Sequence, residues 1–427
     1  MQNIVASARL LISLGFVLHP EKSQFIPSTK VDILGFTIDS VKMIVTLTEE
    51  KRNNLLKLLQ EFVKKNVVPV RKLAQIIGKL IATFPGVMYG PLHFRQLEYN
   101  KIQGLRENGG NFEGYVHIHE NAKEEIRWWI NNLPHAYNVI KHKPPSVTIY
   151  TDASKKGWGA TLNAIETGGA WNKREQRLHI NEKEMLAVHL GSLALTKMFS
   201  DIYIKLLIDN SVVVSILNKM GTSHNEILNN LVFDIWEYFR KKNIWITANY
   251  VSTDENRADK PSRKLYIQGE WQLKRSILNN CLKKLQFTPR VDLFATRLNA
   301  QFNKFVSYHP DPHAIAVDAF SLDWSNIKFY CFPPFRLLSR VLQKIKLEKA
   351  TGVVVAPNWP TQPFHPMLIS MCTKTPILVK RKVSNLILPQ DMKLKNNIAA
   401  KTDLLVCLVS GHTCKNRDSQ NRPFMLL

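Results

Sequence analysis

The chain has 427 residues, 45% hydrophobic and 22% charged, a balance typical of globular proteins with room for two or three domains. Lys and Arg number 58 against 34 Asp and Glu, so the formal net charge is +24 and polyanions, nucleic acid above all, are the expected partners. No run of 18 apolar residues occurs, which excludes a membrane span of ordinary length.

The cysteines indicate an intracellular protein, in the cytoplasm or the nucleus. There are five, all in the last third of the chain, and none forms a C-x-x-C pair. This pattern argues against a disulfide framework and against a zinc site, and it favours free thiols. The first residues, MQNIVASARLLISLGFVLHPEK, lack a basic start and a cleavage site. We therefore expect them to belong to a domain rather than to a signal peptide.

Residues 1–100 are predicted to form an α+β segment. Apolar residues recur with helical spacing in 7–18, 48–66 and 70–84, and Thr48 is the expected N-cap of the second of these helices. Two short strands are expected, KVDILGFTID and KMIVTLT, with a turn around Ser40. Residues 101–145 are predicted to be a connection with the turn-rich RENGGNFEG, a helix ENAKEEIRWWINNL and the linker HKPPS.

Residues 146–266 alternate between strand and helix patterns. The predicted order is three strands, a helix, a strand, two helices, a strand and a short helix. The corresponding stretches are SVTIYTDAS, GWGATLNAI, GGAWNK, NEKEMLAVHLGSLALTKMF, IKLLIDN, SVVVSILNKM, NEILNNLVFDIWEYFRKKN, IWITANYV and NRADKPSRK. This alternation predicts a mixed sheet covered by helices.

Four carboxylates fall at the ends of these elements. Asp152 and Asp209 end strands, whereas Glu184 and Asp259 lie near helix starts, so all four converge if the first and fourth strands are neighbours. Each acid also has a purely structural explanation. Asp152 could be a turn residue, Glu184 could form a capping box with Asn181, Asp209 could cap a helix, and Asp259 could complement a helix dipole.

A group of four acids implies cations between them, because like charges at short range repel strongly. Oxygen-only ligation suits Mg²⁺, with Mn²⁺ as a substitute. Two such ions side by side are the arrangement that enzymes use for phosphodiester hydrolysis. The sequence thus predicts a two-metal nuclease site formed by Asp152, Glu184, Asp209 and Asp259.

The stretches TDAS, NEKEMLAV, IDNSVVV and ENRADKPSR resemble the four catalytic blocks of ribonuclease H, in the form attached to reverse transcriptases. The resemblance implies that the same four acids bind metal and that the substrate is the RNA strand of an RNA–DNA hybrid. Two features depart from the family pattern. YVSTDEN replaces an I-P-G turn before Asp259, and Lys260-Pro261 follows it, so the proline must fall in the first turn of the helix.

The flanking sequence resembles DIRS/Ngaro-type retrotransposon polyproteins over about residues 1–410. LGFVLHPEKSQFIPSTKVDILGFTID is similar to the end of a reverse transcriptase palm, where Leu34, Gly35 and Phe36 match the hairpin that grips the primer. PVRKLAQIIGKLIATFPGVMYGPLHFRQLE is similar to the thumb and connection. The resemblance implies a truncated palm and thumb, a polymerase site lying outside this chain, and the rest of the polyprotein as a possible partner.

Residues 288–410 have a Rossmann-like rhythm that resembles an adenine-N6 methyltransferase segment. Asp292 corresponds to a residue of the nucleoside pocket, and Pro333, Pro334 and Phe335 match part of the D/N-P-P-Y/F/W motif. Phe332 replaces the polar residue of that motif and no glycine-rich turn follows the first strand, so S-adenosylmethionine is not an expected cofactor. Residues 411–427 are predicted to be a disordered tail.

Two alternatives to a ribonuclease remain open at this stage. The chain could be a catalytically inactive, nucleic-acid-binding transposon relic, given its positive charge and the altered turn before Asp259. It could also be a DNA adenine-N6 methyltransferase. Mg²⁺-dependent cleavage of a hybrid separates the first alternative from an active nuclease, and binding of S-adenosylmethionine tests the second.

Overall fold

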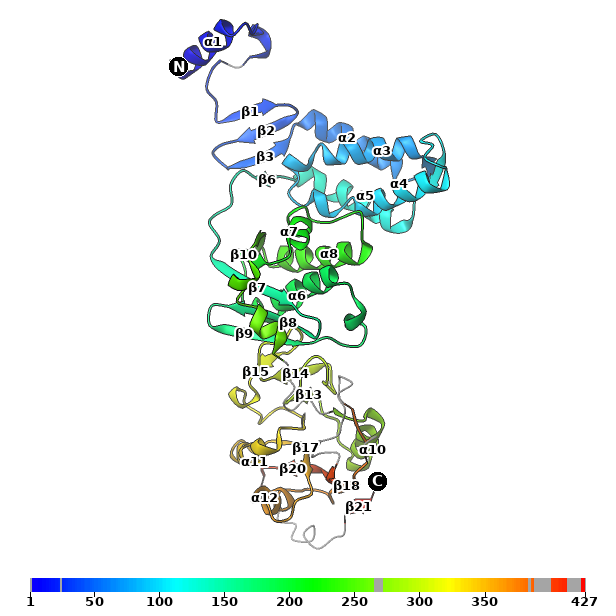
Figure 1. Cartoon of the computed structure of the whole chain (residues 1–427), viewed down its shortest axis with the longest axis vertical. Coiled ribbons are helices and arrows are strands. Elements are labelled where there is room, and N and C mark those ends of the chain that lie inside the picture. The colour runs from blue at the N-terminus through cyan, green and yellow to red at the C-terminus, as the bar shows by residue number, and fades with distance from the viewer. Residues whose placement is uncertain are drawn as a thin grey trace. The chain divides into compact units, whose positions relative to one another are not determined.

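The computed structural model describes residues 2–23, 25–264, 272–382, 385–387, 401–412 and 424–426 (Figure 1). The chain divides into two compact units. One comprises Met1–Pro144 with Asn218–Phe233, and the other comprises Pro145–Leu217 with Asp234–Leu427. Both units combine helices with sheets, so the chain is an α/β and α+β multidomain protein, as predicted. The predicted segment boundaries are finer than these units and stay predictions.

The first unit contains a four-stranded antiparallel sheet in the order β1-β2-β3-β6. Residues 30–39 form a hairpin rather than the single strand predicted, because Leu34 and Gly35 have φ angles of 51° and 78° and reverse the chain. The sheet strands are β1 (Lys30–Ile33), β2 (Phe36–Asp39), β3 (Ile44–Leu47) and β6 (Asn138–Val139).

Three helices of the first unit, α2, α3 and α5, bury an apolar face, whereas the helix Gln2–Ser13 has no buried residue and begins and ends five residues before the stretch predicted, 7–18. The second predicted helix follows Thr48 as expected, and Leu55, Leu59 and Phe62 are buried. Residues 95–107 form a helix that the sequence pattern did not predict. The elements are α1 (Gln2–Ser13), α2 (Glu49–Phe62), α3 (Val70–Ile81), α4 (Arg95–Glu107), α5 (Glu120–Asn132) and the paired strands β4 (Val67–Pro69) and β5 (Tyr115–His117).

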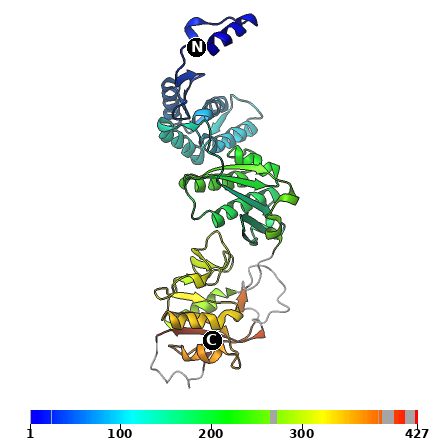
Figure 2. The ribbon, with the colours of Figure 1, turned by 90° about the vertical axis from the view of Figure 1, so that its left-hand side faces the viewer.

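The second unit begins with a five-stranded sheet in the order β11-β10-β7-β8-β9, drawn in green shades in Figure 2. β7, β8 and β9 form an antiparallel meander, and β10 runs parallel to both β7 and β11. The strands are β7 (Val147–Ala153), β8 (Gly157–Leu162), β9 (Ile165–Ala170), β10 (Tyr203–Ile208) and β11 (Trp245–Tyr250). The predicted element order is confirmed, although β9 begins three residues earlier than predicted.

Helix α6 (Ile180–Leu195) packs closely on β7 and β8 because it carries a glycine at the contact. A Cβ at Gly191 would lie 2.7 Å from the Cβ of Ala160 and 3.3 Å from Cγ2 of Thr151. The other helices of this segment of the chain are α7 (Ser211–Asn218), α8 (Glu226–Lys241), whose residues up to Phe233 belong to the first unit, and α9 (Asp259–Arg263). The close packing of α6 brings its first turns toward the sheet edge where β7 and β10 end.

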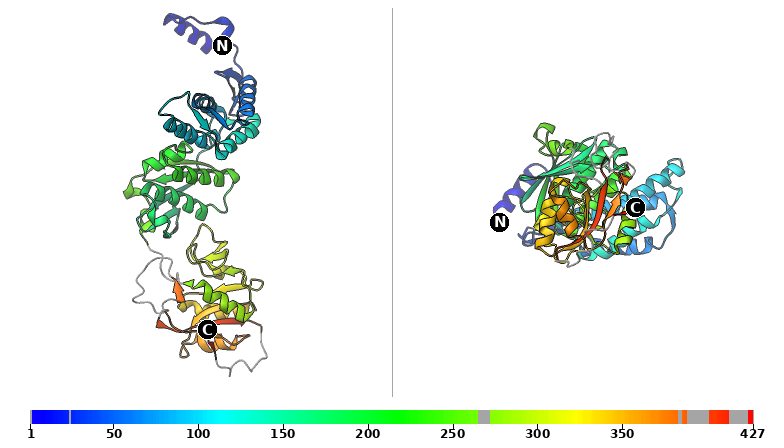
Figure 3. Two further views of the ribbon diagram at one scale, coloured as in Figure 1. Left: turned by 90° about the vertical axis from the view of Figure 1, so that its right-hand side faces the viewer. Right: turned by 90° about the horizontal axis from the view of Figure 1, so that it is seen from below.

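An eight-stranded sheet follows, in the order β15-β14-β13-β16-β17-β20-β18-β21, drawn in yellow to red in Figure 3. The five strands from β15 to β17 are parallel, as expected for a Rossmann-like segment, and β20 is antiparallel to β17. The strands are β13 (Val291–Asp292), β14 (Lys304–Ser307), β15 (Ala316–Val317), β16 (Phe329–Cys331), β17 (Thr351–Pro357), β18 (Ile377–Val379), β20 (Leu404–Ser410) and β21 (Met425–Leu426).

Three helices and a two-stranded ladder complete this part of the chain. They are α10 (Arg275–Leu285), α11 (Leu338–Leu347), α12 (Phe364–Ser370), β12 (Gln272–Leu273) and β19 (Leu386–Ile387). Cys281, Cys331, Cys372 and Cys407 are buried free thiols, and Cys414 lies outside the described residues. Most of the predicted C-terminal tail, 413–423 and 427, also lies outside them.

Within the described ranges, the helices are all too short or too polar to cross a lipid bilayer.

Candidate metal centre

Asp152 and Asp209 lie at the same edge of the five-stranded sheet. β7 and β10 are parallel neighbours, and Thr151 pairs with Ile208. Because each aspartate directly follows one member of that pair, both carboxylates emerge side by side. Asp152 is only 5% exposed, so it is a buried strand residue and not an exposed turn residue. The predicted neighbourhood of the first and fourth strands is therefore confirmed.

Glu184 lies in α6 and takes no part in capping it. The helix begins at Ile180, and its capping box is formed by His179 and Glu182. The Glu182 carboxylate accepts the His179 backbone N–H at 3.0 Å. The alternative explanation of Glu184 as the partner of Asn181 in a capping box is therefore wrong, and the Glu184 carboxylate is left for another role.

Asp209 is likewise not the cap of the helix that follows it. The side-chain oxygen of Asn210 accepts the N–H groups of Val212 and Val213 at 3.1 and 3.2 Å, which caps α7. Asp209 Oδ2 instead accepts a hydrogen bond from the Thr253 hydroxyl at 3.0 Å. The carboxylate of Asp209 is thus held in place from β10 on one side and from the loop after β11 on the other.

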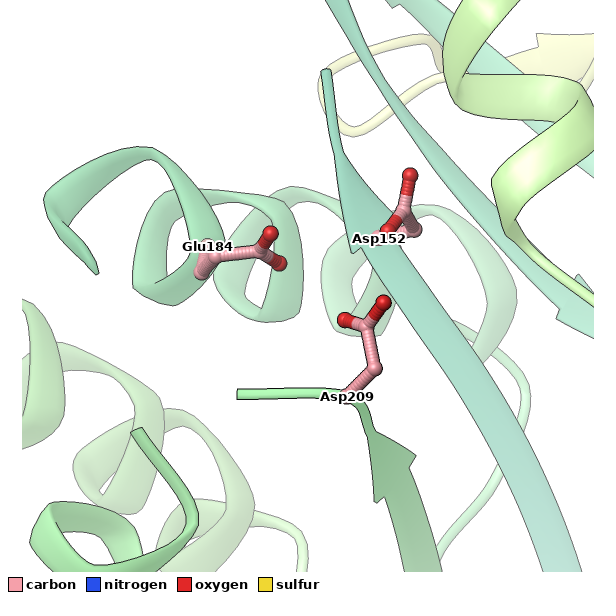
Figure 4. Close-up of side chains that lie close together, drawn as sticks. All are labelled: Asp152, Glu184 and Asp209. Carbon is pink, nitrogen blue, oxygen red and sulfur yellow. The ribbon is translucent and has the colours of Figure 1, made fainter. Parts of the chain in front are cut away.

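The three acids converge into one cluster (Figure 4). Asp152, Glu184 and Asp209 each offer a carboxylate oxygen that lies within 4.8 Å of the other two. Burial, and after it the charges of Asp152 and Asp209, together raise the pKa of Glu184 to about 9. Burial, together with Asp209 and Asp259, raises the pKa of Asp152 to about 6. The cluster therefore resists full ionisation in the absence of a cation.

The cluster has the properties of a site for a hard divalent cation. Its donors are all carboxylate oxygens, which Mg²⁺ and Mn²⁺ prefer. Glu184 Oε2 is buried and has no hydrogen-bond partner, and an unpaired buried acceptor is costly. A cation between the three groups would satisfy this oxygen and offset the repulsion that raises the two pKa values.

Asp259 lies beside the cluster without being a member of it. It is the first residue of α9, and its Oδ1 accepts hydrogen bonds from Arg263 Nε at 2.9 Å and from Arg263 Nη2 at 2.5 Å. Asp259 is nevertheless near enough to act on the charge of Asp152. Pro261 falls in the first turn of α9, as predicted. The structure thus brings three of the four predicted acids together, and the role of Asp259 as a fourth ligand stays a prediction.

Two polar residues that we did not single out from the sequence hold this edge of the site. One is Thr253, the partner of Asp209. The other is the buried Asn256, whose Nδ2 donates to the Thr151 carbonyl at 3.1 Å and whose Oδ1 accepts the Ala258 N–H at 3.1 Å. Both belong to the stretch between β11 and α9. The position of Asn256 in the last quoted block, three residues before Asp259, was the signal that could have found it.

A concave region of about 620 Å³ opens next to Asp259. It is lined by Thr161, Asn163, Ala164, Glu166, Thr253, Asp254, Asn256, Arg257, Asp259, Lys260 and Arg263. Its three cations, Arg257, Lys260 and Arg263, are all exposed. The lining also holds three acids, Glu166, Asp254 and Asp259, and the three cations all lie on the short stretch of chain that carries this candidate metal ligand.

The other predicted sites stay untested. Leu34 forms the tip of the β1–β2 hairpin and is 88% exposed, and Phe36 lies under the Lys51 ammonium at 3.9 Å from its ring centroid. This geometry is that of a hairpin, as the resemblance implies, and its role as a primer grip stays a prediction.

The Asp292 carboxylate is hydrogen-bonded within its own loop. It is 2% exposed, and its carboxylate accepts the backbone N–H groups of Phe294 and Gln301 at 3.3 and 3.1 Å. Burial raises its pKa to about 7. Pro333, Pro334 and Phe335 follow β16, the strand next to β13. Pro334 borders a cavity of about 640 Å³, whose lining does not include Asp292.

No protein-family model and no curated protein matches this chain. Among solved structures it is similar to a foamy viral protease–reverse transcriptase in complex with double-stranded DNA, with 16% identity and a TM-score of 0.28. That match covers 57% of this chain and 41% of the viral chain, so this chain spans less than half of the viral protein. It is also similar to RNase H1 from the archaeon Halobacterium salinarum NRC-1, with 20% identity and a TM-score of 0.23, covering 27% of this chain and 92% of that one.

A third similar structure is the N-terminal RNase H domain of a Mycobacterium tuberculosis protein, solved as a fusion with maltose-binding protein. It is 18% identical with a TM-score of 0.23, and the match covers 27% of this chain and 92% of that one.

Proposed function

We propose that this chain is a divalent-metal-dependent ribonuclease H of retrotransposon origin, which cuts the RNA strand of RNA–DNA hybrids endonucleolytically. The observation that carries the proposal is the cluster of Asp152, Glu184 and Asp209, whose oxygens lie within 4.8 Å of one another. The structural explanations of Glu184 and Asp209 as capping residues do not hold, because Glu182 and Asn210 do the capping.

The three clustered carboxylates would hold the metal ions, with Asp259 as the fourth ligand at the rim. Mg²⁺ bound there supplies an activated water and stabilises the charge that develops on the leaving 3′ oxygen. Two hydrogen bonds position the ligands. Thr253 donates to the Asp209 carboxylate, and Asn256 connects the loop before Asp259 to the end of β7 by donating to the Thr151 carbonyl. Because Glu184 is buried and its pKa is raised, a bound cation is what keeps it ionised at neutral pH.

The choice of an RNA–DNA hybrid as substrate rests on the sequence. The four acidic blocks follow the order found in ribonuclease H, and the net charge of +24 suits a polyanion. The exposed Arg257 and Lys260 line the concavity beside the acids, where they would contact phosphates. Sequence preference should be slight, because such contacts recognise duplex shape and 2′-hydroxyl groups and not base edges. The products would carry 3′-hydroxyl and 5′-phosphate ends.

One observation favours a second candidate, a nucleic-acid-binding protein without nuclease activity. Asp259 is paired with Arg263 and lies outside the cluster. If this pair is permanent, the site lacks its fourth ligand, and the chain would bind hybrids through its basic residues without cutting them.

A hybrid labelled on either strand tests the proposal. With Mg²⁺ present, the RNA strand should be cut at internal positions and the DNA strand should stay intact, whereas EDTA should abolish cleavage. Asp209→Asn preserves the size of the side chain and should slow cleavage by at least about a hundredfold, because even indirect partners of metal ligands are worth 10–100-fold. Salt-sensitive binding of the hybrid without any cleavage would support the second candidate instead.

A further inference from the structure

The ion pair between Asp259 and Arg263 joins the candidate metal centre to the concavity that Arg257 and Lys260 also line. Both nitrogens of Arg263 donate to the same oxygen of Asp259, Oδ1. The two residues are four apart on α9, and both line the concavity. A candidate ligand of a cation site is therefore occupied by a cation of the protein itself.

This ion pair is easily exchanged. The Arg263 side chain is 68% exposed, and the Asp259 side chain is 30% exposed. Exposed pairs at this spacing contribute little stability, because water and salt screen the attraction and two side chains lose freedom. The hydrogen bonds that Arg263 donates to Asp259, and then the charges of Asp259, Asp152 and Asp209, raise the pKa of Arg263, so its positive charge faces three acids.

Phosphate competes well for a guanidinium in this position. The planar fork of arginine matches two phosphate oxygens, and such charge-assisted pairs are among the strongest hydrogen bonds in proteins. Arg257 and Lys260 line the same concavity, so a nucleic-acid backbone entering it would bring phosphates close to Arg263. The competing partner of Arg263 is thus the substrate that the site is proposed to cut.

Building on the proposed function, we propose that Arg263 is a positioning residue that exchanges partners, from Asp259 in the free protein to a backbone phosphate in the complex. The exchange releases Asp259 to join the three clustered carboxylates as the fourth metal ligand. Binding of nucleic acid and full binding of metal are then coupled, and by linkage each strengthens the other by the same factor. Without substrate, the pair keeps the site incomplete.

Mn²⁺ binding measured by titration calorimetry tests the exchange without relying on cleavage. The full chain is titrated alone and in the presence of a short hybrid whose RNA strand carries 2′-fluoro groups that resist hydrolysis. In the parent, the hybrid should raise the affinity for Mn²⁺ about fivefold or more, the lower end of ordinary coupling between sites. In Arg263→Gln, free protein should bind Mn²⁺ more tightly than the parent does, and the hybrid should add almost nothing.

A matched control is Arg240→Gln, which removes one cation and one carboxylate contact elsewhere in the same unit. Arg240 pairs with Glu237 on α8 and does not line the concavity. In this variant, the hybrid should raise the affinity for Mn²⁺ by the same factor as in the parent. Because the Arg263 side chain is exposed, Arg263→Gln should fold as the parent does, and thermal unfolding of the parent and the two variants checks this directly.

Two other outcomes are distinguishable. If the parent binds Mn²⁺ in a manner that Asp209→Asn abolishes, and Arg263→Gln keeps the affinity and the coupling of the parent, the exchange is wrong and the proposed function stands. If the parent binds no Mn²⁺ with or without the hybrid, the proposed function fails, and the exchange fails with it.

Discussion

Asp152 pairs with Gly159 across the antiparallel strands β7 and β8, and the missing side chain of Gly159 makes room for helix α9. A Cβ at this glycine would lie 2.4 Å from the Ser262 nitrogen and 2.6 Å from the Ala258 carbonyl oxygen. Both are backbone atoms, which cannot move aside as a flexible side chain can. The start of α9, and with it Asp259, therefore lies beside Asp152 because position 159 is a glycine.

Gly159→Ala should lower the free energy of unfolding by about 1–3 kcal/mol, the usual cost of forcing an extra carbon into a packed contact. Urea unfolding measures the change. Gly78→Ala is a suitable control, because Gly78 is in the middle of α3 and a Cβ there would have nothing within 4 Å. The control should gain about 0.5–1 kcal/mol from higher helix propensity. Equal unfolding midpoints for Gly159→Ala and the parent would show that the position of α9 does not depend on its close approach to Gly159.

Asn256→Ala should destabilise the protein by about 1–3 kcal/mol, because it leaves the Thr151 carbonyl and the Ala258 N–H without their partner. Both groups lie at the edge that carries the acids, so cleavage of a hybrid should slow as well. Chemical unfolding and the rate of hybrid cleavage are the two measurements. A variant as stable as the parent would mean that another group or water replaces the Asn256 side chain.

The stability of the metal-free protein should fall as the pH rises. Burial raises the pKa of Glu184 from 4.5 to about 9 and that of Asp152 from 3.8 to about 6. Between the unfolded and folded values, the folded chain holds protons that the unfolded chain has lost, so the free energy of unfolding decreases with pH. The contribution of Glu184 is complete below about pH 4.5 and is lost as the pH passes about 9, and that of Asp152 is complete below about pH 3.8 and is lost as the pH passes about 6. Melting temperatures in EDTA across this range measure the fall.

Glu184→Gln should flatten this pH dependence, because an amide does not titrate. Glu125 and Asp292, whose pKa values burial raises to about 8 and about 7, titrate in both proteins, so the difference between the two proteins isolates Glu184. Mg²⁺ should raise the melting temperature of the parent most at high pH, where it no longer competes with a proton. Identical pH profiles for the parent and the variant would contradict the raised pKa of Glu184.

Asp292→Ala should destabilise the eight-stranded sheet region by about 1–3 kcal/mol, because two backbone N–H groups lose their acceptor. S-adenosylmethionine should leave the melting temperature of the parent unchanged, since Phe332 is apolar and Asp292 is already engaged by its own loop. A saturable rise of the melting temperature with S-adenosylmethionine would instead favour a methyltransferase.

Helices and strands could be predicted where one sequence pattern, the spacing of apolar or β-branched residues, dominates the segment. The period of apolar residues located α2 and α3, and runs of β-branched residues located β7, β10 and β11. Helix α4 was missed because its sequence, RQLEYNKIQGLRE, contains few apolar residues and a glycine. The strand pattern alone indicated one strand over residues 30–39, because the turn places Leu34, and not Asn or Asp, in a left-handed conformation, and only the family resemblance implied the β1–β2 hairpin.

The sequence allowed us to predict that Asp152, Glu184 and Asp209 converge, but not where the Asp259 carboxylate lies. The sequence order placed Asp152, Glu184 and Asp209 at ends of elements that meet in this topology, and the cluster follows from the parallel pairing of β7 and β10. No local pattern shows whether Asp259 faces those acids or its own helix. The direction of the Asp259 side chain depends on its i,i+4 ion pair with Arg263, which competes with binding of a metal ion by the same carboxylate. The sequence is compatible with the ion pair and with metal binding alike.

The most direct test of the central claim is the binding of Mn²⁺ to Glu184→Gln and to Glu182→Gln, followed by calorimetry. The two residues are neighbours on α6, but Glu182 caps the helix and Glu184 belongs to the acidic cluster. We predict that Glu184→Gln weakens Mn²⁺ binding by about 10–100-fold or more, whereas Glu182→Gln binds Mn²⁺ as the parent does. Equal affinities for the parent and Glu184→Gln would contradict a metal centre formed by Asp152, Glu184 and Asp209.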